Sequence, residues 1–293
     1  MKYVNSSAFR RALEDRLRAQ SLKTGAPLVR LRKMVAFDRL LARLMAVQAD
    51  AWVLKGGLAL QLRLGDRART TKDIDLHARV EQQSIYDTLI NASALELGDW
   101  FQFEVAQSDT LSPDQVGGAI RFDVQALLDG RPFEKFHVDI GASDPVVEPI
   151  EIIAAPPLLE FADIPATLIP CYPLSQHIAE KVHAYTLPRL SGENSRVKDL
   201  VDILLMAELG QIQGQLLRRA LPATFSVRNT HALPDRLPDP PDDWDAPYRR
   251  LAKEQNMHFD TLPDAGQAAK AFIDPVLQST HSGMWDPLTW SWH

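Results

Sequence analysis

Cysteine is nearly absent from this sequence of 293 residues, and the only one is Cys171. A single cysteine cannot form an internal disulfide or a zinc site that needs paired cysteines. The sequence also lacks a run of about 18 uncharged apolar residues, and its first residues lack the apolar core of a secretory signal. These absences exclude a disulfide-rich secreted scaffold and a membrane-spanning protein, and they predict a cytoplasmic protein that does not contact the membrane.

A strong overall positive charge is also absent, since the net charge is −6, and this excludes a uniformly basic nucleic-acid-binding protein. The charge is unevenly distributed, however. Residues 1–43 contain eleven Lys or Arg and three acidic residues, a net charge of +8 that leaves −14 for the rest. Helical periodicity predicts helices over residues 6–20 and 31–48 with their basic side chains exposed. We expect these helices to contact RNA phosphates; a merely solvated helix surface is the alternative.

The segment VLKGGLALQLRLGDRARTTKDIDLHARV at 53–80 is where the sequence becomes chemically informative. Its pattern predicts a strand, a glycine turn, a short helix, a polar loop and a second strand. Asp73 and Asp75 lie two residues apart in that second strand, so their carboxylates emerge on the same face. Such a pair is suited to a hard divalent ion, and we predict Mg²⁺, with Mn²⁺ as a substitute. A solvated turn is the alternative interpretation.

The glycine pair points to phosphate binding. Gly56 and Gly57 follow Lys55 and open the predicted helix, where backbone N–H groups favour anions and no side chain blocks their approach. A glycine pair alone is weak support, but one followed by Asp-x-Asp on the next strand is the arrangement expected for nucleotidyl or phosphoryl transfer. We therefore assign Lys55, Gly56 and Gly57 to nucleotide binding, and Asp73 and Asp75 to metal binding and catalysis.

A third carboxylate is expected on a neighbouring strand. Asp139 lies in the alternating segment FHVDIG at 136–141, on the face opposite the apolar side chains, and could join Asp73 and Asp75 as a metal ligand. Asp123 competes for this place by the same reasoning. We prefer Asp139, because Arg121 beside Asp123 is typical of an ordinary exposed strand face.

Three later segments complete the pattern: EKVHA at 180–184, RVKDLVDI at 196–203 and RNTHALPDRLPDPPDDWDAPYRRLA at 228–252. Together with LKGGLAL and TTKDIDL, they make the sequence resemble the AbiEii-like nucleotidyltransferase toxins of type IV toxin-antitoxin systems, which include the mycobacterial MenT toxins. The resemblance implies an α/β (α+β) fold with a DNA-polymerase-β-like nucleotidyltransferase core and an added helical half. It also implies nucleotide transfer from an NTP, transfer RNA as the best characterised acceptor, and a separate antitoxin protein.

The resemblance also extends to residues of the second half. Lys181 matches the lysine of a family helix, and Asp199 matches the acidic residue of the R-x-[RK]-D-x-x-D segment. We expect Lys181 to be a point-charge phosphate ligand and Arg196 a forked one, with Asp199 orienting Lys181 or contacting the nucleotide; Lys181 and Asp199 are both assigned to catalysis. A surface ion pair between Lys181 and Asp199 is the alternative.

One position departs from the family pattern. Members often carry Ser or Thr within or after the glycine pair, whereas this sequence has Leu58 there. The missing hydroxyl contact to the nucleotide would then come from Thr70 or Thr71, of which we assign Thr71 to nucleotide binding.

We predict an N-terminal nucleotidyltransferase domain over residues 1–155 and a mostly helical domain over residues 156–293. The proline-rich stretch 156–173 is interpreted as a linker, with an active-site cleft between the two halves. The favoured function is Mg²⁺-dependent transfer of nucleotides from NTP to an RNA 3′ end, with tRNA as the expected acceptor, which would inhibit translation and growth. The alternatives are a transferase acting on a protein or small-molecule hydroxyl, and a non-catalytic binding module.

Overall fold

The computed structural model describes residues 1–68, 71–108, 119–142, 149–188, 196–279 and 283–293. The chain divides into two compact units. The first consists of Met1–Ser143 and Glu151–Cys171, and the second of Asp144–Ile150 and Tyr172–His293. The first unit thus continues past the predicted boundary at residue 155.

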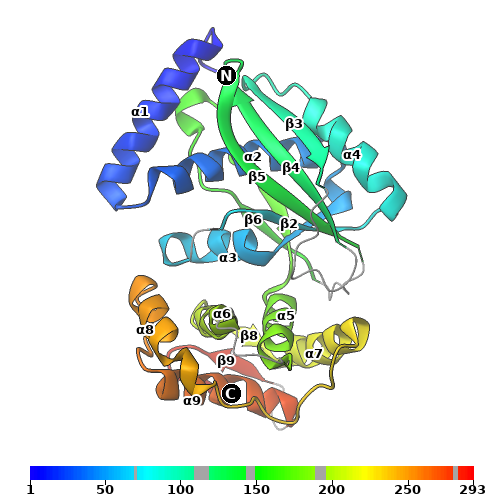
Figure 1. The fold of residues 1–293 in the computed structure, drawn as a ribbon, viewed down its shortest axis with the longest axis vertical. Coiled ribbons are helices and arrows are strands. Elements are labelled where there is room, and N and C mark those ends of the chain that lie inside the picture. The colour runs from blue at the N-terminus through cyan, green and yellow to red at the C-terminus, as the bar shows by residue number, and fades with distance from the viewer. Residues whose placement is uncertain (69–70, 109–118, 143–148, 189–195, 280–282) are drawn as a thin grey trace. The chain divides into compact units, whose positions relative to one another are not determined.

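A mixed sheet forms the centre of the first unit (Figure 1). Among the described residues its strand order is β3-β4-β5-β2-β1-β7-β6, with β2 parallel to β5, β1 parallel to β7, and the other pairs antiparallel. The strands are β1 (Trp52–Lys55), β2 (Ile74–Ala78), β3 (Phe101–Gln107), β4 (Ile120–Leu128), β5 (Arg131–Gly141), β6 (Glu151–Ala154) and β7 (Leu168–Cys171).

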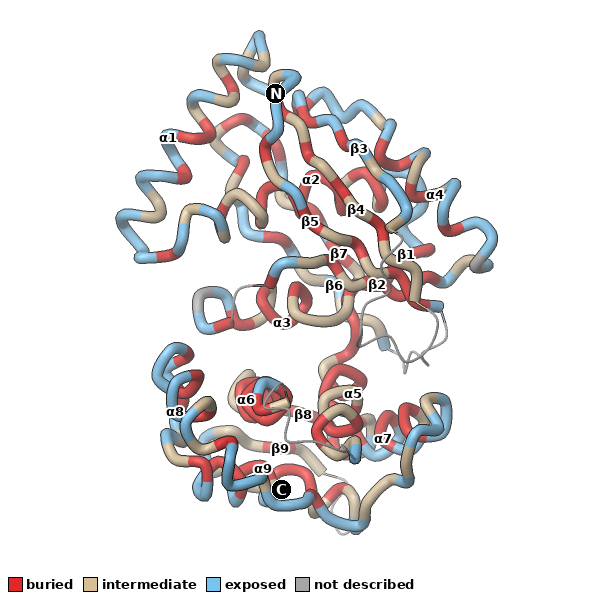
Figure 2. Tube along the Cα trace, in the orientation of Figure 1, coloured by how far each residue is buried: buried red, intermediate tan, exposed pale blue. Residues whose placement is uncertain are grey.

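Helices cover the apolar face of this sheet. The helices of the first unit are α1 (Ser6–Thr24), α2 (Leu28–Gln48), α3 (Gly56–Leu64) and α4 (Gln82–Ala94). Because side chains alternate along a strand, the buried Phe136 and Val138 of β5 lie on the face that packs against α2. The rings of Phe37 and Phe136 pack edge to face there, with their centroids 4.9 Å apart. Figure 2 shows buried residues running through α2 and the central strands. The opposite face of β4 and β5 carries the polar side chains, so the alternation separates the core from the chemistry.

The proline-rich stretch that was predicted to be a linker is part of the first unit. It contains β7, whose pairing with β1 and β6 extends the sheet, and Cys171 at its end is fully buried. The interpretation as a linker was therefore wrong.

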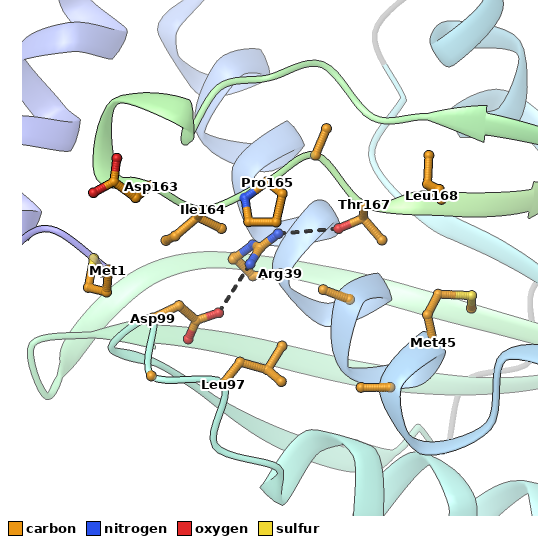
Figure 3. A pocket seen from close by; sticks show the side chains of 14 residues that line it. Met1, Arg39, Met45, Leu97, Asp99, Asp163, Ile164, Pro165, Thr167 and Leu168 are labelled. Atoms are coloured by element: carbon orange, nitrogen blue, oxygen red, sulfur yellow. Dashed lines mark hydrogen bonds and ion pairs between the residues drawn. The ribbon is translucent and has the colours of Figure 1, made fainter.

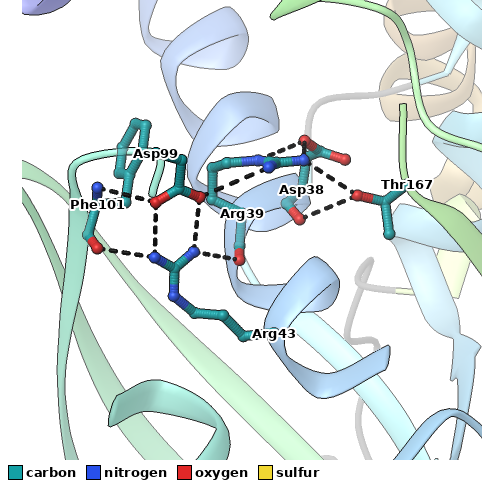
Figure 4. Close-up of polar contacts among 6 residues, drawn as sticks. All are labelled: Asp38, Arg39, Arg43, Asp99, Phe101 and Thr167. Carbon is teal, nitrogen blue, oxygen red and sulfur yellow. Dashed lines mark hydrogen bonds and ion pairs between the residues drawn. The ribbon is translucent and has the colours of Figure 1, made fainter. Parts of the chain in front are cut away.

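Two basic residues of α2 are buried, although the sequence predicted exposed basic side chains on this helix. Arg39 and Arg43 of α2 are 4% and 1% exposed, and Asp99, which is 2% exposed, accepts two hydrogen bonds from Arg43 at 2.7 and 2.8 Å. Arg39 lies between Asp38 and Asp99 and also donates to Thr167 (Figure 4). These two arginines therefore tie α2 to the loop before β3 and to the approach to β7, and they are not available to RNA.

Other basic residues of these helices remain at the surface. Arg11, Arg18 and Lys23 of α1 are exposed, while Arg32 of α2 is held by Glu14 and Glu134 at 2.7 and 3.1 Å. The predicted positive surface is thus confined mainly to α1.

Helices dominate the second unit. They are α5 (Leu174–Thr186), α6 (Val197–Ala207), α7 (Gly214–Arg228), α8 (Asp245–Glu254) and α9 (Leu262–Leu277), accompanied by the short strands β8 (Ile212–Gln213), β9 (Met284–Asp286) and β10 (Ser291–Trp292). Phe272 of α9 packs between Trp285 and Trp292, and both indoles donate to backbone carbonyls. No described helix combines the length and apolar character required to span a bilayer.

Candidate active site

The turn from β1 into α3 requires glycine. Gly56 has φ +64°, a left-handed conformation that a residue with a side chain rarely adopts. A Cβ placed on Gly56 would lie 1.9 Å from Oδ2 of Asp75, so the carboxylate occupies the space that any larger residue would need. The absence of a side chain at Gly56 therefore allows the first turn of α3 to lie against the Asp75 carboxylate.

Four charged residues form one row across the sheet. The strand register pairs Lys55 with Asp75, Asp75 with Asp139, and Asp139 with Arg121. Residues paired in this way project from the same face, and neighbouring strands are about 4.8 Å apart. The row therefore runs from the glycine turn to β4 in the order cation, carboxylate, carboxylate, cation.

Asp73 lies directly before β2, two residues from Asp75. Its backbone carbonyl accepts a hydrogen bond from the Thr71 hydroxyl at 3.2 Å, and Thr71 is 7% exposed. The backbone N–H of Thr71 donates in turn to Gln61 of α3 at 3.5 Å. Thr71 therefore fixes the approach to the carboxylate pair, and its hydroxyl is already used by the protein. Thr70 lies outside the described residues.

Arg121, which was not among the predicted site residues, is held in this row by Asp139. Its Nε and Nη2 donate to the two oxygens of Asp139 at 2.7 and 2.6 Å. The hydrogen bonds from Arg121 to Asp139 raise the pKa of the guanidinium; burial acts in the opposite direction, and the negative charges of Asp139, Asp73 and Asp75 raise the pKa further. Arg121 therefore lies within the electrostatic field of the whole acidic group.

The donor set fits a divalent ion bound through two carboxylates. Asp73 and Asp75 provide hard oxygen ligands at i and i+2, and Mg²⁺ is usually bound by one or two carboxylates together with substrate phosphates. Within the part of the chain that is described, no three His, Cys, Asp or Glu side chains are gathered as a metal site. Asp139 is beside Asp75 as predicted, but both its oxygens turn to Arg121, so the predicted trio is not assembled as a ligand set.

The competitor Asp123 has a different neighbour. The register pairs it with His137, and its Oδ1 lies 2.6 Å from the Nδ1 of that ring. In the sheet order, β4 is separated from β2 by β5. The register therefore places Asp139, and not Asp123, next to Asp75.

In the second unit, Lys181 of α5 contacts two carboxylates of α6. Its Nζ lies 3.0 Å from Asp199 and 2.7 Å from Asp202, whose side chains are 6% and 1% exposed. Arg196 at the start of α6 lies 3.4 Å from the other oxygen of Asp199. The predicted proximity of Lys181, Arg196 and Asp199 is confirmed. Lys181 and Asp199 form an ion pair between two helices, as the alternative held, but the carboxylate is buried and does not lie at the surface. Asp202 was missed as a site residue; its spacing of three from Asp199 on one helix was the available signal.

The RNTH segment at 228–231 forms a structural corner. Asn229 ends α7 in the left-handed conformation with φ +44°. His231 then contacts the hydroxyls of Thr186 and Thr230 at 2.8 and 3.0 Å, and Thr230 also contacts His183 at 2.8 Å. These contacts join the ends of α5 and α7.

A cavity of about 490 Å³ in the first unit lies away from these residues. Its walls come from α2, from the loop before β3 and from residues 163–168, and Arg39 and Thr167 are among the lining residues (Figure 3). None of its lining residues is one of the predicted site residues. The cavity is therefore separate from the charged row.

The sequence and the fold were compared with those of known proteins. The family model for the nucleotidyl transferase AbiEii toxin of type IV toxin-antitoxin systems matches residues 39–279. The chain belongs to the AbiEii family. This assignment establishes a nucleotidyltransferase toxin, with an NTP as substrate and an antitoxin as partner.

Solved structures give the fold. The MenT4 nucleotidyltransferase toxin of Mycobacterium tuberculosis is similar with a TM-score of 0.55 and 19% identity over 91% of this chain and 98% of its own. The JHP933 protein of Helicobacter pylori has a TM-score of 0.45 and 14% identity over 85% of this chain and 96% of its own. An antigenic nucleotidyltransferase-like protein of Paracoccidioides brasiliensis has a TM-score of 0.43 and 16% identity over 69% and 94%, respectively. The first confirms the expected mixed α/β fold; no curated protein matches the sequence.

Proposed function

We propose that this AbiEii protein is a Mg²⁺-dependent enzyme that transfers a nucleotide from NTP to the 3′ end of an RNA, with tRNA as the acceptor. The observation that supports the proposal is the row formed by Lys55, Asp75, Asp139 and Arg121, which begins at a helix N-terminus opened by glycine. It combines an anion site, the metal-binding carboxylate Asp75 with Asp73 two residues before it, and an arginine held by Asp139. Transfer to RNA would inactivate the acceptor and stop translation.

The two ends of the row suit different parts of the substrate. The N–H groups at the start of α3 have no side-chain cap and no acidic residue in the first turn, so they can bind the terminal phosphates of NTP together with Lys55. Asp73 and Asp75 would hold the metal ion, which would neutralise charge on the leaving pyrophosphate. The acceptor oxygen bonds to the α-phosphorus, the bond to the β-phosphate oxygen breaks, pyrophosphate leaves and the hydroxyl proton is released.

The proposal also includes Lys181, Arg196 and Asp199, because these residues match motifs of the family. Lys181 is a cation held by two buried carboxylates, and such a fixed ammonium is suited to bind a phosphate oxygen. We propose that Asp199 keeps Lys181 in place and that Arg196 adds a second cation beside it.

The test is to incubate the purified protein with total RNA, Mg²⁺ and each of the four labelled NTPs in turn. Asp75→Asn should abolish transfer, because the amide keeps the side-chain volume next to Gly56 but removes the charge. Asp129→Asn, a change of the same kind in the β4–β5 turn, should retain it. Label in an RNA of tRNA size with wild type and Asp129→Asn only would support the proposal. Equal labelling by Asp75→Asn, or label only in protein or small molecules, would contradict it.

A further inference from the structure

Arg121 has hydrogen-bonding capacity that its partner does not use. Its Nε and Nη2 donate to Asp139, and no described residue accepts a hydrogen bond from Nη1 of Arg121. The side chain is 17% exposed, so one edge of the guanidinium is fixed by Asp139 while the other is open to a ligand. A guanidinium in this state is a preformed donor for a phosphate or carboxylate, since its fork geometry matches both.

The position of Arg121 in the row indicates which substrate it contacts. The glycine turn follows β1, the metal-binding pair is on β2, and Arg121 is on β4, beyond Asp139 on β5. In phosphoryl transfer the attacking and leaving oxygens lie roughly in line through the phosphorus. When the leaving pyrophosphate lies toward the glycine turn, the attacking hydroxyl must come from the side of β5 and β4.

We propose that Arg121 binds the phosphodiester that precedes the 3′-terminal nucleotide of the acceptor RNA and that Asp139 is the positioning residue that fixes its guanidinium. This inference rests on the proposed function, because it assigns the acceptor side of the same site. It gives Asp139 a role other than the third metal ligand expected from the sequence. The reason is that both carboxylate oxygens of Asp139 already accept hydrogen bonds from Arg121.

The β4–β5 hairpin also contains a matched control. Arg131, at the opposite end of β5, pairs with Asp129 at 2.6 Å, so it offers the same charge and the same type of ion pair outside the row. Arg131→Gln removes one positive charge from the same hairpin without touching the acidic group. Its comparison with Arg121→Gln separates a specific contact from a general loss of positive charge.

Initial rates measured against RNA and NTP concentration test the inference. Arg121→Gln should raise the KM for RNA by roughly ten-fold or more, the usual consequence of losing a charge-assisted contact, and should leave the KM for NTP unchanged. Arg121→Lys should recover part of the loss, and Arg131→Gln should behave as wild type. Asp139→Asn should raise the KM for RNA without changing the Mg²⁺ dependence, and combining it with Arg121→Gln should add nothing further.

Two results would overturn the inference. A raised KM for NTP with an unchanged KM for RNA in Arg121→Gln would place the arginine on the triphosphate. A shifted Mg²⁺ dependence in Asp139→Asn, with a further loss in the double variant, would make Asp139 a metal ligand. Thermal unfolding of each variant identifies any that simply fails to fold, and Arg121→Lys then serves as the milder substitution.

Failure of the proposed function would be seen separately, as wild-type protein that transfers no nucleotide to any RNA. The inference is then decided by binding alone, with a 5′-fluorescein-labelled single-stranded RNA oligonucleotide and Mg²⁺. Arg121→Gln should weaken binding and reduce the slope of log K against log salt by about 0.7, the value for one phosphate contact on a single strand. A slope and an affinity equal to those of wild type would refute the contact.

Discussion

Replacing Gly56 by alanine tests the link between the glycine turn and the metal-binding carboxylate most directly. The new Cβ would lie 1.9 Å from Oδ2 and 2.8 Å from Cβ of Asp75, so backbone as well as side chain must move. Restoring an ordinary contact displaces the carboxylate oxygen by about 1.5 Å. Because a misplacement of about 1 Å can cost ~100-fold in rate, we expect kcat for nucleotide transfer to fall at least ~100-fold.

The cost in stability can be worked out in the same way. An alanine in the left-handed conformation destabilises the fold by ~1–2 kcal/mol, and the forced contact by ~1–3 kcal/mol. The reduced conformational entropy of the unfolded chain offsets ~0.4–1 kcal/mol of this loss. The free energy of unfolding should therefore fall by about 1–5 kcal/mol, measured by urea denaturation of the full chain. Gly130 provides the control, since its φ is +63° and no atom lies within 4 Å of the position of a Cβ. Gly130→Ala should show the backbone strain and keep its activity.

Two outcomes would refute this reasoning. Wild-type rates in Gly56→Ala would show that the carboxylate does not need the space beside the turn. An equal loss of activity in Gly130→Ala would show that activity follows stability alone and not the position of Asp75.

Three further predictions concern groups that are buried or partly buried. Burial raises the pKa of Cys171 to about 12, so iodoacetamide should label this thiol only after the first unit unfolds; rapid labelling of the native protein would contradict its burial. Burial lowers the pKa of His231 below its ordinary value near 6.5, so the folded state favours the neutral ring and the free energy of unfolding should fall as the pH drops below about 6.5. His231→Gln should reduce this dependence, and an unchanged pH profile would show that other groups cause it. Asp99→Ala should cost roughly 3–5 kcal/mol, because Arg43 then remains as a buried charge, and Asp99→Ala with Arg43→Met should recover part of the loss in urea denaturation. Loss of less than about 1 kcal/mol in Asp99→Ala would mean that water solvates Arg43.

The sequence was most informative where the chemistry follows from local spacing. Asp73 and Asp75 share a face because side chains alternate in a strand, and the glycine pair opens a helix because only glycine tolerates the turn. Alternation in residues 136–141 likewise put Asp139 on the polar face of β5. These predictions needed only the periodicity of a strand or a helix, which is set by neighbouring residues in the chain. The family motifs supplied the remaining assignments, Lys181 and Asp199.

Tertiary structure decided which charges are paired. Charge counting assigned Arg39 and Arg43 to an exposed basic surface, but the fold brings Asp99 to them from a distant segment. In the same way, the pairing of β4 with β5 gives Asp139 to Arg121, although the sequence suggested a metal ligand and an ordinary exposed arginine. The extension of the first unit to Cys171 depended on β7 pairing with β1, a contact between segments more than a hundred residues apart. The sequence by itself thus determined the elements around the glycine turn and the Asp-x-Asp strand, and it predicted a nucleotidyltransferase site there, whereas β7 was missed. Only the fold decided the partner of each charge, because long-range strand pairing brings those residues together.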